Sequence, residues 1–81
     1  MSDETVLSRI SELVEEEHRL RRQLAAGEIS TEQEHARLRT VEEALDQCWD
    51  LLRRRRAAAH EGQSPDTVAP RPVNEVEGYL Q

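Results

Sequence analysis

The stretch Leu24-Ala25-Ala26-Gly27-Glu28-Ile29-Ser30-Thr31 lies between two amphipathic segments and decides the fold. Gly27 can adopt the left-handed conformation that ends many helices. Ser30 or Thr31 can accept a hydrogen bond from the unpaired amides at the start of the next helix, and a glutamine or glutamate lies three residues after each of them. The stretch therefore predicts a tight, capped turn between two antiparallel helices.

Apolar residues recur at helical spacing on both sides of this turn. In the first segment they follow one seam of a seven-residue repeat, namely Val6, Ile10, Leu13, Leu20 and Leu24, flanked by Leu7 and Val14. In the second segment they are Leu38, Val41, Leu45, Cys48 and Leu52, flanked by Ala44 and Trp49. We expect helices over residues 3–26 and 31–61, the first capped by Ser2 or Asp3 and the second closed by Gly62. Glu17 places a carboxylate on the first seam.

The expected second helix is longer than the first, so residues 53–60 should project past the hairpin, helical by propensity but without an apolar face. The composition changes after Gly62, and Pro70-Arg71-Pro72 must be extended. The chain thus divides into a helical hairpin over residues 1–62 and a proline-containing tail over residues 63–81. Apolar residues in the tail are expected to dock on the hairpin as one short turn or strand: Val73, Val76, Tyr79 and Leu80.

Size and composition favour an assembly. A chain of 81 residues buries only roughly 60% of its unfolded surface, and two amphipathic helices cannot cover both of their own apolar faces. The predicted fold is all-α, an antiparallel, coiled-coil-like two-helix hairpin with an extended C-terminal tail that assembles as a dimeric four-helix bundle. The residues expected at the interface are Leu13, Leu20, Leu38, Leu45, Trp49 and Leu52, with Trp49 as the anchor.

Several classes of function find no support in the residues. The single cysteine, Cys48, cannot form an internal disulfide and has no neighbour in the sequence that would activate a thiol. No apolar run approaches the roughly 20 residues of a membrane helix, and the acidic N-terminus is unlike a secretory signal. No phosphate loop, nucleophile elbow or zinc-type cysteine pair is present. We therefore expect a cytoplasmic protein that is no enzyme, with no catalytic residues and no cofactor.

The run Arg53, Arg54, Arg55 and Arg56 is one candidate binding site. Arginine binds phosphate in a bidentate manner, so the run could grip nucleic acid or act in a ribonucleoprotein. The formal net charge of -6 and the lack of interleaved aromatic residues oppose that reading, and cations also stabilise a helix C-terminus. Residues 1–35 hold nine acids against four arginines, so the N-terminal half of a second copy is an equally suitable partner.

A repeated Glu-x-x-His pattern is the other candidate site. Glu15 with His18, and Glu32 with His35, each place an oxygen and a nitrogen on one helix face, as in carboxylate-bridged di-iron bundles. Such sites need further carboxylates aimed at the same interior, and both histidines lie beside the seams. In so acidic a chain the spacing arises often by chance. Metal binding is therefore an alternative, and solvated helix faces are the simpler interpretation.

Several stretches also carry a family resemblance: Ile10–Val14 with Glu16–His18, Gly27–Leu38, Leu45–Arg53 and Val76–Gln81. Together they resemble the small bacterial proteins grouped as domain of unknown function 2630, over nearly the whole chain. That resemblance implies no catalytic or binding residues. The turn also resembles short helical-hairpin oligomerisation modules with a Gly-x-Ile-Thr-x-Glu-Glu signature, although Ser30 replaces the threonine and His35 an aromatic residue. This second likeness implies self-association.

These observations predict a non-enzymatic helical interaction or oligomerisation module, whose partner is a second copy or another protein and not a membrane. Two alternatives stay open: a nucleic-acid accessory that uses Arg53–Arg56, and a carboxylate-histidine metal protein. All basic residues are arginine, a usage typical of GC-rich bacterial coding.

Overall fold

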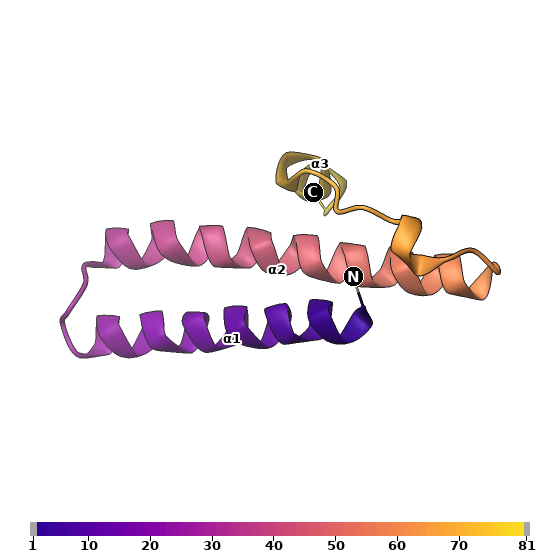
Figure 1. Cartoon of the computed structure of the whole chain (residues 1–81). Coiled ribbons are helices and arrows are strands. Elements are labelled where there is room, and N and C mark those ends of the chain that lie inside the picture. The colour runs from indigo at the N-terminus through magenta and orange to yellow at the C-terminus, as the bar shows by residue number, and fades with distance from the viewer. Residues whose placement is uncertain (1, 81) are drawn as a thin grey trace.

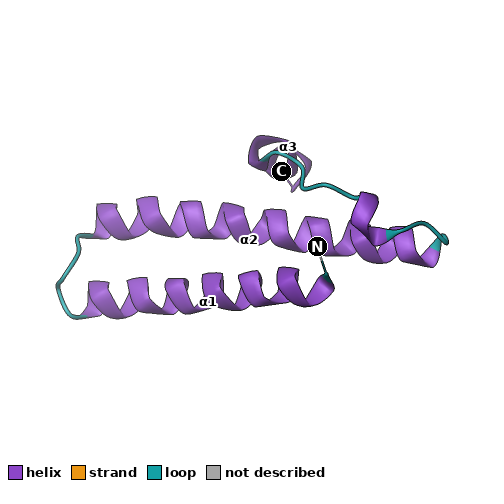
Figure 2. Cartoon of the chain, in the orientation of Figure 1, coloured by secondary structure: helices purple, strands orange, loops and turns teal. Residues whose placement is uncertain are grey.

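The computed structural model describes residues 2–80, without the side chain of Leu80. Two long helices, α1 (Asp3–Ala25) and α2 (Thr31–His60), form an antiparallel hairpin (Figure 1). A 3-10 turn, η1 (Pro65–Thr67), and a short helix, α3 (Val73–Leu80), follow. Figure 2 shows that the described residues contain helices and loops and no strand. The predicted all-helical class and the extensive packing of α1 on α2 are therefore confirmed.

The turn between the helices has the predicted chemistry. Gly27 takes a φ of 74°, in the left-handed region. The Ser30 hydroxyl accepts a hydrogen bond from the Gln33 amide at 3.1 Å, and the Gln33 side chain accepts one from the Ser30 amide at 2.9 Å. This reciprocal pair is a capping box, which makes Ser30, one of the two candidates, the N-cap of α2. Ser2 is the N-cap of α1, where its hydroxyl accepts from the Thr5 amide at 3.1 Å.

The seam between α1 and α2 is the core of the molecule. Toward the turn, Leu13 and Leu20 pack with Leu38 and Val41; toward the open end, Val6 and Ile10 pack with Leu51 and Leu52. All eight of these side chains are buried, so the chain covers most of its own seam. That burial differs from the expectation that the seam residues need a second chain to cover them.

The far end of α2 differs from the prediction in one respect. Residues 53–60 are helical, as expected, but they do have a buried face, made by Arg55 and Ala58. The chain reverses after Gly62, which has a φ of 81°, and returns along α2, where η1 packs. Val68 joins the core cluster around Leu52. The expected bare projection is therefore wrong, because the tail folds back over it.

The tail docks on the hairpin as a helix and not as a turn or strand. Figure 1 shows α3 on the side of α2 that faces away from α1. Val76 of α3 is buried and Val73 is half-buried, whereas Tyr79 is exposed. The expected docking of Leu80 concerns a side chain outside the described residues. Because α1, α2 and α3 lie roughly in one layer, the Cα trace measures 51 × 25 × 13 Å, and both broad faces of the hairpin stay uncovered over much of their length.

Candidate protein-interaction surface

Three large apolar side chains on the hairpin are exposed although they flank the buried seam. Leu7 and Val14 of α1 are each 39% exposed, and Trp49 of α2 is 43% exposed. Leu7 and Val14 lie one heptad apart, so they occupy the same side of α1. We call these three residues the apolar face.

The surface groove on the opposite side of the hairpin shows that all three residues share one face. Two adjoining depressions follow the junction of α1 and α2, and Arg9 of α1 lines both of them. The α2 residues that line them include Ala44, Cys48 and Leu51. Successive helical residues are about 100° apart, so Trp49 lies across the Leu45–Leu52 row from Cys48. In α1, Leu7 and Val14 likewise lie across the seam from Arg9. The apolar face therefore covers the broad side of the hairpin away from the groove.

Trp49 also lies at the right level along the hairpin to complete this surface. Asp3 contacts Arg55 across the seam, and the antiparallel register that follows places Trp49 level with Arg9, between Leu7 and Val14. Scattered exposed apolar residues are ordinary on protein surfaces, but a cluster of large ones marks an interaction site. The apolar face is therefore the candidate site.

Five of the six residues predicted at an interface between copies are instead covered by packing within a single copy. Leu13, Leu20, Leu38 and Leu52 are buried between α1 and α2, and Leu45 is half-buried beside them. Trp49 is the member that stays accessible. Leu7 and Val14 were not among the predicted interface residues, and their offset from the seam was the signal that they would be exposed.

The four-arginine run is divided by the fold. Arg55 is 4% exposed, and its guanidinium donates to Asp3 at 2.9 Å, to the Pro65 carbonyl at 3.1 Å and to Asp66 at 3.3 Å. The hydrogen bond to Asp3, and the second to Asp66, raise the pKa of Arg55. Arg55 thus ties the start of α1 and the tail to α2, and is not available to a phosphate group in this fold.

Arg54 is also used within the chain. It donates to Asp50 at 3.2 Å and to the Ala69 carbonyl at 2.9 Å, and is half-buried. Arg53 and Arg56 are exposed, with Arg56 reaching Asp3 only at 3.9 Å. Phosphate binding by the run stays a prediction, and the fold leaves two of its four side chains exposed for it.

Asp50 organises the docking of the tail. Its carboxylate is buried at 3% exposure and accepts from Arg71 at 3.1 Å as well as from Arg54. The hydrogen bond from Arg71, followed by that from Arg54, lowers the pKa of Asp50 despite its burial. Gln47 donates to the Arg71 carbonyl at 2.9 Å, and the Arg71 guanidinium lies 5.8 Å from the Tyr79 ring centroid. The sequence did not predict this cluster. Its only signal was an aspartate in the second predicted helix and, later in the chain, a single arginine between two prolines.

The predicted metal ligands do not come together. Glu15, His18, Glu32 and His35 are all exposed on α1 and α2. Among residues 2–80, no group of three or more histidine, cysteine, aspartate or glutamate side chains is placed to hold a metal ion. Glu17 pairs with Arg21 at 3.7 Å, which accounts for the carboxylate on the first seam.

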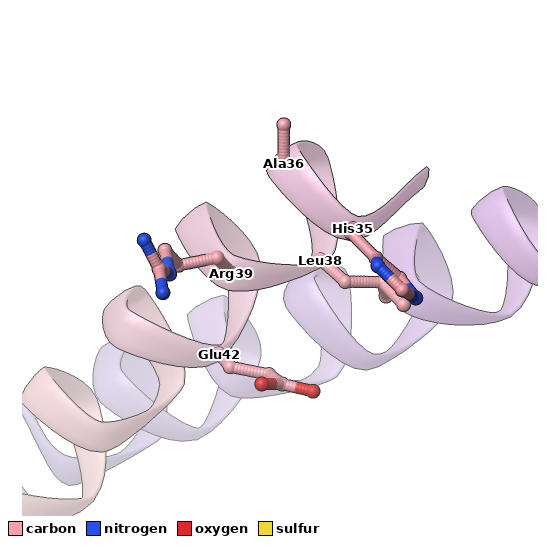
Figure 3. A pocket seen from close by; sticks show the side chains of 5 residues that line it. All are labelled: His35, Ala36, Leu38, Arg39 and Glu42. Atoms are coloured by element: carbon pink, nitrogen blue, oxygen red, sulfur yellow. The ribbon is translucent and has the colours of Figure 1, made fainter. Parts of the chain in front are cut away.

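A surface depression near the start of α2 has no convergent set of polar groups among the described residues that line it. Figure 3 shows the depression lined by His35, Ala36, Leu38, Arg39 and Glu42, whose side chains point in different directions around α2. Cys48, at the groove, is half-buried, and burial raises its pKa while the charge of Arg9 opposes that shift. The thiol is therefore protonated at neutral pH and is a poor nucleophile.

Four carboxylates and one arginine meet where α3 packs on α2. Glu77 of α3 shares a depression with Arg39, Glu42, Glu43 and Asp46 of α2. Burial raises the pKa of Glu77, and its hydrogen bond with Asp46 and the neighbouring negative charges raise it further. Repulsion at this point opposes the docking that Asp50 and Arg71 favour.

We expect α3 to dock more weakly as the pH rises above the ordinary pKa of a glutamate. A docked Glu77 holds its proton more tightly, so its contribution is present below its ordinary pKa and is lost as the pH rises through the raised value. Asp50 acts in the opposite sense and loses its contribution only as the pH falls below about 3.9. Amide protection factors of residues 73–79 measure the docking. Glu77→Gln should remove the dependence above pH 5, and Glu75→Gln, on the same helix but exposed, should keep it. Equal profiles for wild type and Glu77→Gln would contradict this account.

None of the described helices is long and apolar enough to cross a bilayer. Comparison with known proteins matches nearly the whole chain to bacterial relatives. Residues 2–81 match the family described as "Protein of unknown function (DUF2630)". An uncharacterized protein of Mycobacterium bovis is 49% identical over 78 residues, covering 96% of this chain and 90% of the relative. Uncharacterized proteins from two strains of Mycobacterium tuberculosis match with the same identity and coverage. No solved structure matches the chain.

Proposed function

Because this chain belongs to the DUF2630 family of proteins of unknown function, we propose its role from its own surface. It is a non-enzymatic helical module that associates with a second copy of itself, through the apolar face, to form a four-helix bundle. A cytoplasmic setting, in which Cys48 stays reduced, is part of this proposal.

The observation that carries the proposal is the exposed cluster of Leu7, Val14 and Trp49 on a molecule one layer thick. A hairpin with a closed seam needs no partner to fold, so large apolar side chains beside that seam call for another explanation. A second hairpin laid on this face would bury all three and would complete the two-layer packing typical of helical bundles. The turn between α1 and α2, which resembles that of short helical-hairpin oligomerisation modules, is consistent with this role.

Replacement of Trp49 tests the proposal. We expect wild-type protein to have the mass of a dimer at tens of micromolar in light scattering, and Trp49→Ala to have that of a monomer. Tryptophan is a frequent interface anchor, and the change removes one anchor from each copy, so association should weaken by at least about 100-fold. Helicity by circular dichroism should be retained, since the seam itself is intact.

Tyr79→Ala is the matched control, because Tyr79 is also an exposed aromatic residue but lies on α3, away from the apolar face. It should leave the dimer intact. Leu7→Gln provides a second test that keeps a good helix former in α1, and it should also yield a folded monomer. A wild-type chain that stays monomeric at 500 µM, or a Trp49→Ala chain that stays dimeric, would refute the proposal.

A further inference from the structure

We propose that the two copies pair about a two-fold axis that runs along the hairpin, so that α2 of each copy lies over α1 of the other. Trp49 of each copy then fills the space between Leu7 and Val14 of the other, and Arg53 of each lies beside Glu4 of the other. This inference rests on the proposed self-association and specifies its geometry.

The shape of the apolar face carries the first step. Leu7 and Val14 are separated by about 10 Å along α1, and Trp49 lies level with Arg9, inside that gap and nearer to Leu7. A two-fold axis along the hairpin preserves this level, so it brings each indole over the gap of the other copy. Large side chains then pack between smaller ones, as ridges pack into grooves in helical bundles.

Charge carries the second step. The first turn of α1 holds Asp3 and Glu4, and the α2 residues at the same level of the hairpin include Arg53 and Arg56. The preserved level therefore places the arginines of one copy over the acids of the other. The Arg56 guanidinium lies 3.9 Å from its own Asp3. Because Arg56 is 62% exposed, it has room for a second acidic neighbour. Arg53 and Glu4 are both exposed.

The available area supports a stable pair. The 23 residues of α1 span about 35 Å, and two adjacent helices are about 20 Å wide. One face of the hairpin thus offers roughly 700 Å² per copy, near the 800 Å² that each partner contributes to a standard interface. The predicted contact is therefore close in area to a standard specific interface.

A two-fold axis across the hairpin is the competing geometry. It would stack Trp49 on Trp49 and α1 on α1, and would place Arg53 near the acidic residues Glu42 and Asp46 of the other copy. Glu4 would then lie near Glu15 of the other copy. The two geometries therefore respond differently to a reversed charge at Glu4.

Charge reversal, measured by sedimentation at about 20 mM salt, tests the inference. Glu4→Arg and Arg53→Glu each create like-charge contacts at two symmetric points, so each variant alone should dimerise roughly three- to tenfold more weakly. An equimolar mixture of the two variants should recover wild-type affinity, because both contacts in the mixed pair join opposite charges. At 0.5 M salt the differences should vanish.

Glu16→Arg and Arg37→Glu are the controls, since they change the net charge equally but both line the groove on the opposite side of the hairpin from the apolar face; they should dimerise like wild type. If Glu4→Arg is harmless and Arg53→Glu is not, or if mixing fails to restore affinity, this geometry is wrong while self-association stands. A wild-type chain that is monomeric throughout would instead overturn the proposed function as well.

Discussion

Leu52→Ala is expected to lower the free energy of unfolding by about 2–5 kcal/mol. Leu52 is 1% exposed and packs with Val6, Ile10 and Leu51 where the two helices and the returning tail meet. The substitution removes buried methyl groups and leaves a cavity that a one-layer hairpin has few side chains to fill. Urea denaturation at submicromolar concentration, where a single copy prevails, measures the effect.

Leu7→Ala is the matched control for this prediction. It removes the same atoms from a leucine that is 39% exposed, so its cost in the single chain should stay below about 1 kcal/mol. The ratio of the two effects separates the seam from the apolar face. Similar losses for Leu52→Ala and Leu7→Ala would show that the seam is not the core described here.

Asp50→Asn is expected to release α3 from the hairpin. The neutral side chain no longer compensates Arg71 and Arg54, both of which donate to the buried carboxylate. The free energy of unfolding should fall by about 1–3 kcal/mol, since both arginines are half-buried and regain water. Hydrogen exchange should show residues 73–79 losing most of their protection while α1 keeps its own.

Asp46→Asn, one helical turn before Asp50, controls for the loss of an acidic residue from α2. Asp46 faces Glu77, so its neutralisation removes a repulsion and should leave α3 equally or better protected. If Asp50→Asn and Asp46→Asn gave the same protection of residues 73–79, the Asp50–Arg71 contact would not be what holds the tail.

The parts of the fold governed by local chemistry were predictable from the sequence. Gly27 and Ser30 act within their own turn, and the seam follows from the spacing of residues such as Leu13 and Leu38, because helical periodicity needs no tertiary information. The family assignment was confirmed for the same reason, since its motifs cover the chain.

The contacts that fix the tail were not predictable, because they join residues far apart in the chain. A run of four arginines reads as one basic patch, yet α2 turns Arg55 toward Asp3 and Asp66 and leaves Arg53 in solvent. The apolar residues of the tail predicted that it would dock on the hairpin, but nothing in the local sequence indicates that residues 65–68 would pack against this end of α2. The same contacts explain why the predicted phosphate site retains only part of its residues.

Of the three residues of the apolar face, the sequence predicted only one at an interface. Trp49 was expected to anchor an interface, whereas Leu7 and Val14 were assigned to the seam because they extend its apolar stripe. The distinction depends on which side of the seam each residue occupies once the helices are paired, and this requires the register of α1 against α2.

Fluorescence of Trp49, the only tryptophan in the chain, tests the central claim that the apolar face is covered by a second copy. Emission should shift to longer wavelength when the protein is diluted from about 100 µM to 0.1 µM, because indole leaves an apolar contact for water as pairs dissociate. Far-UV circular dichroism should change little over the same range, since each hairpin keeps its own seam. An emission maximum that is independent of concentration, in a chain that stays helical throughout, would contradict the account.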